Sequence, residues 1–156
     1  FEAVSIGEPL LTSDEDFQTV ADAIVEPPPP MMTADRHLLH GPRHRADSNA
    51  VYAKMQQLLT DGGHENYFVG TVEATPSLED VLALVQAGSY ERVVLRLMIV
   101  AGDHATTTWQ AMKRLLEDDF EAAGYQVECL VNGLGELEAV QNLLVAHAQA
   151  AIDALN

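Results

Sequence analysis

Apolar residues recur along this chain with two spacings, and segments of the two kinds alternate. Short segments rich in apolar residues predict strands at 67–72, 93–100 and 126–131, with a weak strand at 36–39 and a short apolar segment at 1–6. Apolar residues three or four positions apart, typical of a helix with one buried face, fill the stretches between most of these runs. Strands and helices that alternate in this way predict a parallel sheet with right-handed crossover connections.

The predicted helices carry start and stop signals. Ser13 and Ser77 are expected N-caps, and each precedes acidic residues that favour the positive end of a helix dipole. Asp47 or Ser48 is expected to cap a helix between them, and two more helices are predicted at 109–123 and 137–155. The residues expected to face the core in the first three helices are Phe17, Val20, Ala21 and Ile24, then Val51, Met55, Leu58 and Leu59, then Leu78, Val81, Leu82 and Val85.

Four consecutive prolines, Pro27–Pro30, separate the first predicted helix from the rest of the chain. Proline has no N–H group to continue a helix, and a proline run favours a stiff, extended linker. This stretch is therefore the predicted domain boundary, with residues 1–30 on one side and residues 31–156 on the other.

The most apolar stretch, Val93–Val100, is interrupted only by Arg96. It predicts a parallel strand that helices cover on both faces. Asp103 and His104 follow directly after Ala101-Gly102, at the carboxyl end of the strand, where open parallel sheets bind their ligands. Asp103 could equally be a helix cap and His104 a polar turn residue, and both interpretations stay open at this point.

The charge of the chain limits its partners. The formal net charge is −16, from 24 acidic and 8 basic residues, so the chain repels nucleic acid and anionic membrane surfaces and attracts cations. A single cysteine, Cys129, excludes an internal disulfide framework. We expect no signal peptide within this sequence, and no apolar run in it approaches twenty residues. We expect a soluble protein, cytoplasmic or, if a signal peptide has been removed, periplasmic.

Three polar residues fall at equivalent places, each shortly after a predicted strand: His40, Glu73 and His104. If the strands are neighbours in one parallel sheet, the three side chains converge on the same edge. Two imidazoles and one carboxylate suit zinc, cobalt, nickel or ferrous iron and leave coordination positions open for a substrate. Asp103 could orient one of the histidines by accepting a hydrogen bond from the ring nitrogen that does not bind the metal.

Basic residues gather around the first of these histidines. Arg36, Arg43 and Arg45 could bind carboxylates or phosphates, although solvated loop charges explain any one of them more simply. His44 is a plausible accessory group. Gly133-Leu134-Gly135 could present backbone N–H groups to a ligand or could be a plain turn.

Five segments also carry a resemblance to a known family. They occur in the order Val69–Glu73, Pro76–Val81, Leu97–Ala105, Ala122–Tyr125 and Gly133–Glu136. In this order they resemble the anaerobic cobalt chelatases, the sirohydrochlorin cobaltochelatases of the CbiK type in the class II chelatase superfamily. The block Val-Ala-Gly-Asp-His-Ala is the most specific of them. The resemblance implies a lyase that inserts Co²⁺ into sirohydrochlorin during anaerobic cobalamin biosynthesis.

The resemblance also implies roles for individual residues. His40 and His104 are the expected catalytic and metal-binding histidines, with Glu73 as the third metal ligand. Apart from what the resemblance implies, we expect Arg43, His44 and Arg45 to contact the tetrapyrrole, from their charge and their position beside His40. Co²⁺ enters as the substrate metal, and no organic cofactor is expected. The chain departs from the family pattern around His40, where Leu39 and Pro42-Arg43 flank the histidine.

The implied fold is a chelatase-like, Rossmann-like α/β lobe with three αβα layers. The family has two such lobes, and this chain resembles the end of the first (residues 1–30) and the whole of the second (31–156). The chain is therefore expected to be a fragment or to act with a partner chain, and a homo-oligomer is one possibility. The alternatives are a metal or tetrapyrrole carrier without turnover, a chelatase for Fe²⁺ or Ni²⁺, and an unrelated ligand-binding α/β domain.

Overall fold

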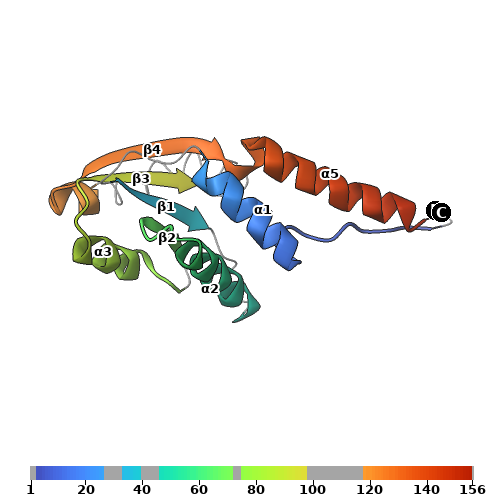
Figure 1. Cartoon of the computed structure of the whole chain (residues 1–156), viewed down its shortest axis with the longest axis horizontal. Helices are drawn as coiled ribbons and strands as arrows, with labels where there is room; N and C mark the ends of the chain where they lie inside the picture. The colour runs from blue at the N-terminus through green and yellow to red at the C-terminus, as the bar shows by residue number, and fades with distance from the viewer. Residues whose placement is uncertain (1–2, 27–32, 40–45, 72–74, 98–117, 156) are drawn as a thin grey trace.

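The computed structural model describes residues 3–26, 33–39, 46–71, 75–97 and 118–155. Within these ranges the elements follow one another in the alternating order that the sequence predicts (Figure 1). They are α1 (Asp14–Val25), β1 (Thr33–Leu39), α2 (Ala46–Asp61), β2 (Tyr67–Thr71), α3 (Leu78–Ala87), β3 (Arg92–Leu97), β4 (Gln126–Gly133), the 3₁₀ turn η2 (Leu134–Glu136) and α5 (Glu138–Asp153). Residues 118–122 are also helical.

The four strands form one sheet in the order β2-β1-β3-β4, and every neighbouring pair is parallel. The predicted parallel sheet is therefore confirmed. Val93, Val94 and Leu95 of β3 are all buried, as expected for a strand covered on both faces. Residues 98–105, the remainder of the predicted strand and the block after it, lie outside the described residues.

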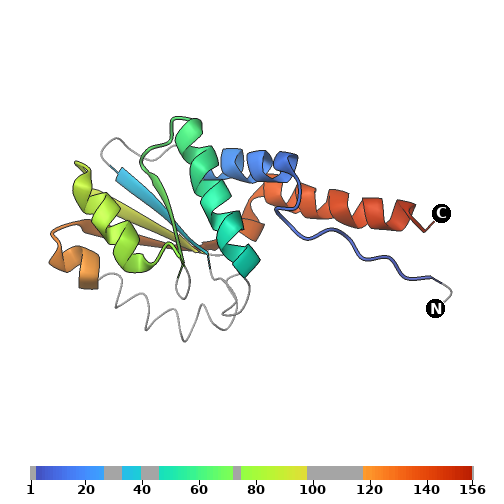
Figure 2. The same ribbon diagram turned by 90° about the horizontal axis from the view of Figure 1, so that it is seen from below.

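Helices cover both faces of the sheet, so the architecture has the three αβα layers that were predicted (Figure 2). Side chains of β2 alternate between the faces: Phe68 points to one and Val69 to the other. The face of Phe68 carries α3 and residues 118–122. Its buried core contains Phe68, Val81, Val85, Val93, Leu95 and Phe120.

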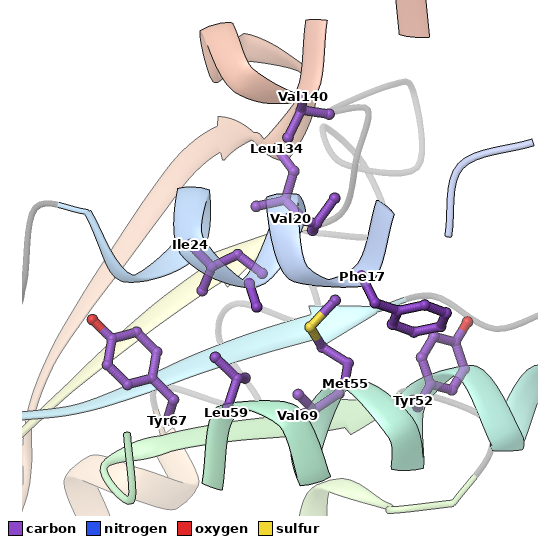
Figure 3. Packing of buried hydrophobic residues seen from close by; sticks show 11 residues of the cluster. Phe17, Val20, Ile24, Tyr52, Met55, Leu59, Tyr67, Val69, Leu134 and Val140 are labelled. Atoms are coloured by element: carbon purple, nitrogen blue, oxygen red, sulfur yellow. The ribbon is translucent and has the colours of Figure 1, made fainter. Parts of the chain in front are cut away.

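The other face carries α1, α2 and the beginning of α5, as Figure 3 shows. Its core contains Phe17, Val20, Ala21, Ile24, Tyr52, Met55, Leu59, Tyr67, Val69, Leu134 and Val140. All four residues predicted for the buried face of α1 are in this core. Although α1 precedes the proline run, it shares its core with elements that follow it. The boundary at residue 30 stays a prediction.

The predicted helix starts are confirmed for α1 and α3. Ser13 and Asp16, and likewise Ser77 and Asp80, form capping boxes in which each serine accepts from a backbone N–H and each aspartate accepts from the N-cap. The predicted start of α2 is two or three residues too late, because the helix begins at Ala46 and an N-cap precedes the first helical residue. Asp47 and Ser48 thus lie in its first turn.

The prediction of a strand at the beginning of the chain is wrong for the residues that the structure describes. Residues 3–9 form no strand, and Val4 and Ile6 are 75% and 89% exposed. The segment instead runs beside α5, where the His147 ring contacts the carbonyl oxygen of Glu8 (Nδ1···O 2.9 Å). At Gly7 a Cβ atom would lie 3.1 Å from the carbonyl oxygen of His147. The close approach leaves little room for a side chain.

α5 projects beyond the sheet (Figure 1), with Val140 near its start in the core and His147 further along in contact with Asp16 of α1. The predicted helix at 109–123 is observed only at its end, 118–122, since residues 98–117 are outside the described ranges. Gly124, with φ +93°, provides the expected stop. Across the described ranges, no helix combines the length and apolar character that crossing a membrane requires.

Candidate metal-binding edge of the sheet

The strands that precede the three predicted metal ligands are neighbours in the sheet. β1 lies between β2 and β3, and the strands end nearly level: Leu39 pairs with Thr71, and Leu38 pairs with Leu97. The carboxyl ends of β1, β2 and β3 therefore form one continuous edge. This is the spatial condition that the predicted ligand set requires.

The connections that follow β1 and β3 lie on opposite faces of the sheet. From β1 it crosses to β2 through α2 on one face, and from β3 it crosses to β4 past Phe120 on the opposite face. Connections that leave two adjacent strands toward opposite faces define a topological switch point, where open α/β sheets bind ligands. The switch point lies between β1 and β3, the strands that lead to His40 and His104.

The predicted site residues themselves lie outside the described residues. These are His40, Arg43, His44, Arg45, Glu73, Asp103 and His104. His40 is one residue beyond the end of β1 and Glu73 two beyond the end of β2, and neighbouring strands are about 5 Å apart. His104 follows β3 by seven residues, so the end of that strand constrains it less. The ligand set stays a prediction.

The connection that contains Glu73 is held at both ends. The backbone N–H and the hydroxyl of Thr71 both donate to the carbonyl oxygen of Pro76, at 2.8 and 3.0 Å. Thr71 is fully buried. Directly afterwards α3 begins with the Ser77 cap, and hydrogen bonds from the Ser77 N–H and hydroxyl lower the pKa of Asp80. The described ends of this short connection are thus fixed to β2 and α3.

The end of β4 carries the Gly133-Leu134-Gly135 sequence. The N–H of Gly133 donates to Oε1 of Glu136 at 3.1 Å, and Leu134 is buried in the core. Residues Leu134–Glu136 form a 3₁₀ turn that leads into α5. The Gly133 N–H, which was considered for ligand binding, instead donates to the Glu136 carboxylate. The interpretation of this segment as a turn therefore holds at Gly133.

A pair of polar side chains, which the sequence did not reveal, joins α1 to α5. Nε2 of His147 lies 3.2 Å from Oδ1 of Asp16. Burial acts to raise the pKa of Asp16, but hydrogen bonds from Ser13, Thr12 and His147 outweigh it and lower the pKa below 3.8. Among the described residues no three His, Cys, Asp or Glu side chains could hold a metal ion, this junction included.

Solved structures share this architecture. A putative cobalamin biosynthesis CbiX protein from Marinobacter aquaeolei matches 79% of this chain and 97% of its own, with 21% identity and a TM-score of 0.58. The multi-domain protein DR2241 from Deinococcus radiodurans, described as structurally similar to chelatases, matches 83% of this chain and 29% of its own, with 22% identity and a TM-score of 0.57. The fold is therefore that of the chelatases.

Sequence comparison identifies the family within this fold. The chain belongs to the cobalt chelatase (CbiK) family, whose family model matches residues 1–153. The sirohydrochlorin cobaltochelatase of Salmonella typhimurium is 29% identical over 163 residues. That match covers 98% of this chain but 58% of the Salmonella protein, so the chain spans less than two thirds of this relative.

Proposed function

We propose that this chain binds Co²⁺ at the carboxyl edge of its sheet and takes part in inserting the ion into sirohydrochlorin. The observation that carries the proposal is the order β2-β1-β3, which makes neighbours of the three strands that precede His40, Glu73 and His104. Membership of the cobalt chelatase family and the named activity of the Salmonella relative support the choice of metal and tetrapyrrole.

In this proposal His40, Glu73 and His104 bind Co²⁺ and leave coordination positions open for the pyrrole nitrogens. Metal insertion also requires two pyrrole N–H protons to leave the macrocycle. A metal-bound imidazole nitrogen cannot accept a proton at the same moment, so a neighbouring group such as His44 must share the proton transfer. Arg43 and Arg45 would bind carboxylates of the tetrapyrrole, because a guanidinium pairs with a carboxylate through two hydrogen bonds.

The negative charge of the chain favours the metal rather than the macrocycle. With a net charge of −16, the chain attracts Co²⁺ and repels a polycarboxylate. The arginines after β1 would offset this repulsion locally. We therefore expect added salt to weaken Co²⁺ binding, since mobile ions screen the attraction.

The test is the substitution His104→Ala in the purified chain, with Co²⁺ affinity measured by calorimetry and metallation followed by the absorbance of sirohydrochlorin. We expect affinity to fall by more than about tenfold, the loss that even outer-shell partners of a metal site cause. Metallation should stop. The matched control is His64→Ala, because His64 lies just before β2, at the opposite edge of the sheet, and packs edge-on against Tyr67.

Two outcomes would contradict the proposal. If His104→Ala metallates sirohydrochlorin at the rate of the unchanged chain, the assigned ligand set is wrong. If the unchanged chain binds Co²⁺ and forms no metallated product over hours, it is a carrier and not a chelatase. Parallel titrations with Fe²⁺ and Ni²⁺ would show whether cobalt is the preferred metal.

A further inference from the structure

Both ring nitrogens of His147 face hydrogen-bond acceptors. Nδ1 lies 2.9 Å from the carbonyl oxygen of Glu8, and Nε2 lies 3.2 Å from Oδ1 of Asp16 in α1. A neutral imidazole has one N–H donor and one acceptor nitrogen, whereas an imidazolium donates from both nitrogens. Only the imidazolium form of His147 therefore makes both contacts as hydrogen bonds.

Asp16 cannot supply a proton to this contact. Its carboxylate accepts from the Ser13 hydroxyl at 2.8 Å and from the Thr12 N–H at 2.9 Å, and hydrogen bonds lower its pKa below 3.8. The carboxylate is therefore ionised near neutral pH. A neutral His147 ring would direct the lone pair of one nitrogen either at this carboxylate or at the carbonyl oxygen of Glu8.

The charge that favours the imidazolium form comes from α1. The side chain of His147 is 17% exposed, and Asp16 is buried. α5 itself has no Asp, Glu, Lys or Arg from Ala139 to Ile152, and from the N-terminal side the ring meets a backbone carbonyl. Within the described ranges, Asp16 is thus the ionised side chain that the structure pairs with His147.

The N-terminal segment, which we define as residues 3–8, depends on this ring for its place beside α5. Val4 and Ile6 are largely exposed, so burial of apolar side chains contributes little to holding the segment. The hydrogen bond that the structure gives to residues 3–8 is the one between the His147 ring and the Glu8 carbonyl oxygen. Loss of this bond would therefore free the segment.

The chain that follows the N-terminal segment is held to α1 instead. The hydroxyl of Thr12 donates to the carbonyl oxygen of Pro9 at 2.6 Å, and the Thr12 N–H donates to Asp16. These bonds do not involve His147. The segment can consequently move about Pro9 while the beginning of α1 keeps its capping box.

We propose that His147 is a pH-sensitive clasp, in which the imidazolium form holds residues 3–8 against α5 and loss of a proton releases them. The held form requires a proton that the released form does not, so acid favours holding and alkali favours release. Histidine suits this role, because its ordinary charge change falls between about pH 5 and 8. The inference does not depend on the proposed chelatase function.

The test is nuclear magnetic resonance of the purified chain at about pH 6 and about pH 9, on either side of the ordinary charge change of histidine. The ¹⁵N signals of the His147 ring show whether one or both nitrogens are protonated. The ¹³Cα relaxation of residues 3–8 shows whether the segment is held. At the lower pH we expect an imidazolium and a held segment, and at the higher pH a neutral ring and a segment that relaxes as flexible chain. Both changes should have the same midpoint.

Three variants separate the clasp from a general effect of pH. In His147→Gln the relaxation of residues 3–8 should be the same at both pH values, because glutamine does not titrate. Asp16→Asn should move the release toward lower pH by about one unit, since the carboxylate no longer favours the imidazolium. The matched control is His64→Gln, because His64 packs against Tyr67 before β2, and this variant should keep the full response.

The proposal is overturned if one ring nitrogen of His147 is unprotonated while the segment is held, or if residues 3–8 relax identically at the two pH values. It is also overturned if His147→Gln responds as the unchanged chain does, or if Asp16→Asn leaves the midpoint in place. Circular dichroism checks that each variant is folded. The ring signals of the unchanged chain decide the question even if His147→Gln does not fold.

Discussion

Two helices of this chain begin with the same pattern, Ser-x-x-Asp, yet the two beginnings have different surroundings. Ser13 and Asp16 start α1, and Ser77 and Asp80 start α3, and both pairs form a capping box. Asp16 is only 3% exposed, whereas Asp80 is exposed to solvent. The same local motif therefore lies in a buried junction in one case and at the surface in the other.

The difference arises from residues far away in the sequence. Besides the Ser13 hydroxyl, Asp16 accepts from the N–H of Thr12 at 2.9 Å and contacts His147, 131 positions further along the chain. The partners that the structure gives Asp80 are the N–H and hydroxyl of Ser77. A capping pattern thus fixes where a helix begins, and the tertiary contacts decide how much its loss costs.

The two caps should differ most in how much the free energy of unfolding falls when the aspartate is removed. Asp16→Ala should lower the free energy of unfolding by about 3 kcal/mol, because it removes a cap and leaves buried donors without an acceptor. Asp80→Ala should lower it by clearly less, since water can replace the lost acceptor there. Urea unfolding of both variants measures the difference. Equal losses would show that burial of Asp16 adds nothing to its role.

A double-mutant cycle isolates the contact between α1 and α5. Asp16→Ala and His147→Ala should be coupled by about 1 kcal/mol, because the two side chains interact directly. The comparison cycle, Asp80→Ala with His147→Ala, should be additive, since these residues belong to different junctions. Absence of coupling in the first cycle would mean that the His147 contact contributes no stability.

The smallest effect is on the pH dependence of folding. The pKa of Asp16 is lowered in the folded chain, so its ionised form contributes stability that is complete above the usual value of 3.8 and is lost as the pH falls through the folded pKa. The difference in unfolding free energy between the unchanged chain and Asp16→Asn should be constant near neutral pH and shrink below about pH 4. A difference that grows in acid would reverse the assigned direction.

Much of the fold could be predicted from local patterns. Buried positions in α1 and α3 followed from helical spacing, and both helix starts followed from Ser-x-x-Asp. Segments whose state depends on a neighbour were predicted less well. Val4 and Ile6 resemble a strand in sequence, but a strand needs a paired partner and this segment lies beside α5 instead. Glu136 accepts from the Gly133 N–H with the N-cap to N3 spacing of a capping box, but Gly133 lacks the serine or threonine that marks this motif in a sequence.

For the candidate site, the predicted ligand set required three strands to be neighbours, and the sheet order meets this condition for β1, β2 and β3. Alternation of strands and helices predicts parallel pairing, but it cannot predict that β1 is inserted between β2 and β3. That order follows from which helix covers which face. The positions of His40, Glu73 and His104 stay predictions, because the side chains follow the strand ends at distances of one to seven residues.

The contact at Gly7 has a further consequence. A methyl group at this position would lie 3.1 Å from the carbonyl oxygen of His147, closer than an ordinary van der Waals contact, so the beginning of the chain or α5 would have to shift slightly. Larger residues at position 7 would push the N-terminal segment and α5 further apart. Alanine would shift the segment slightly, and valine would lift it further, without altering any charged group.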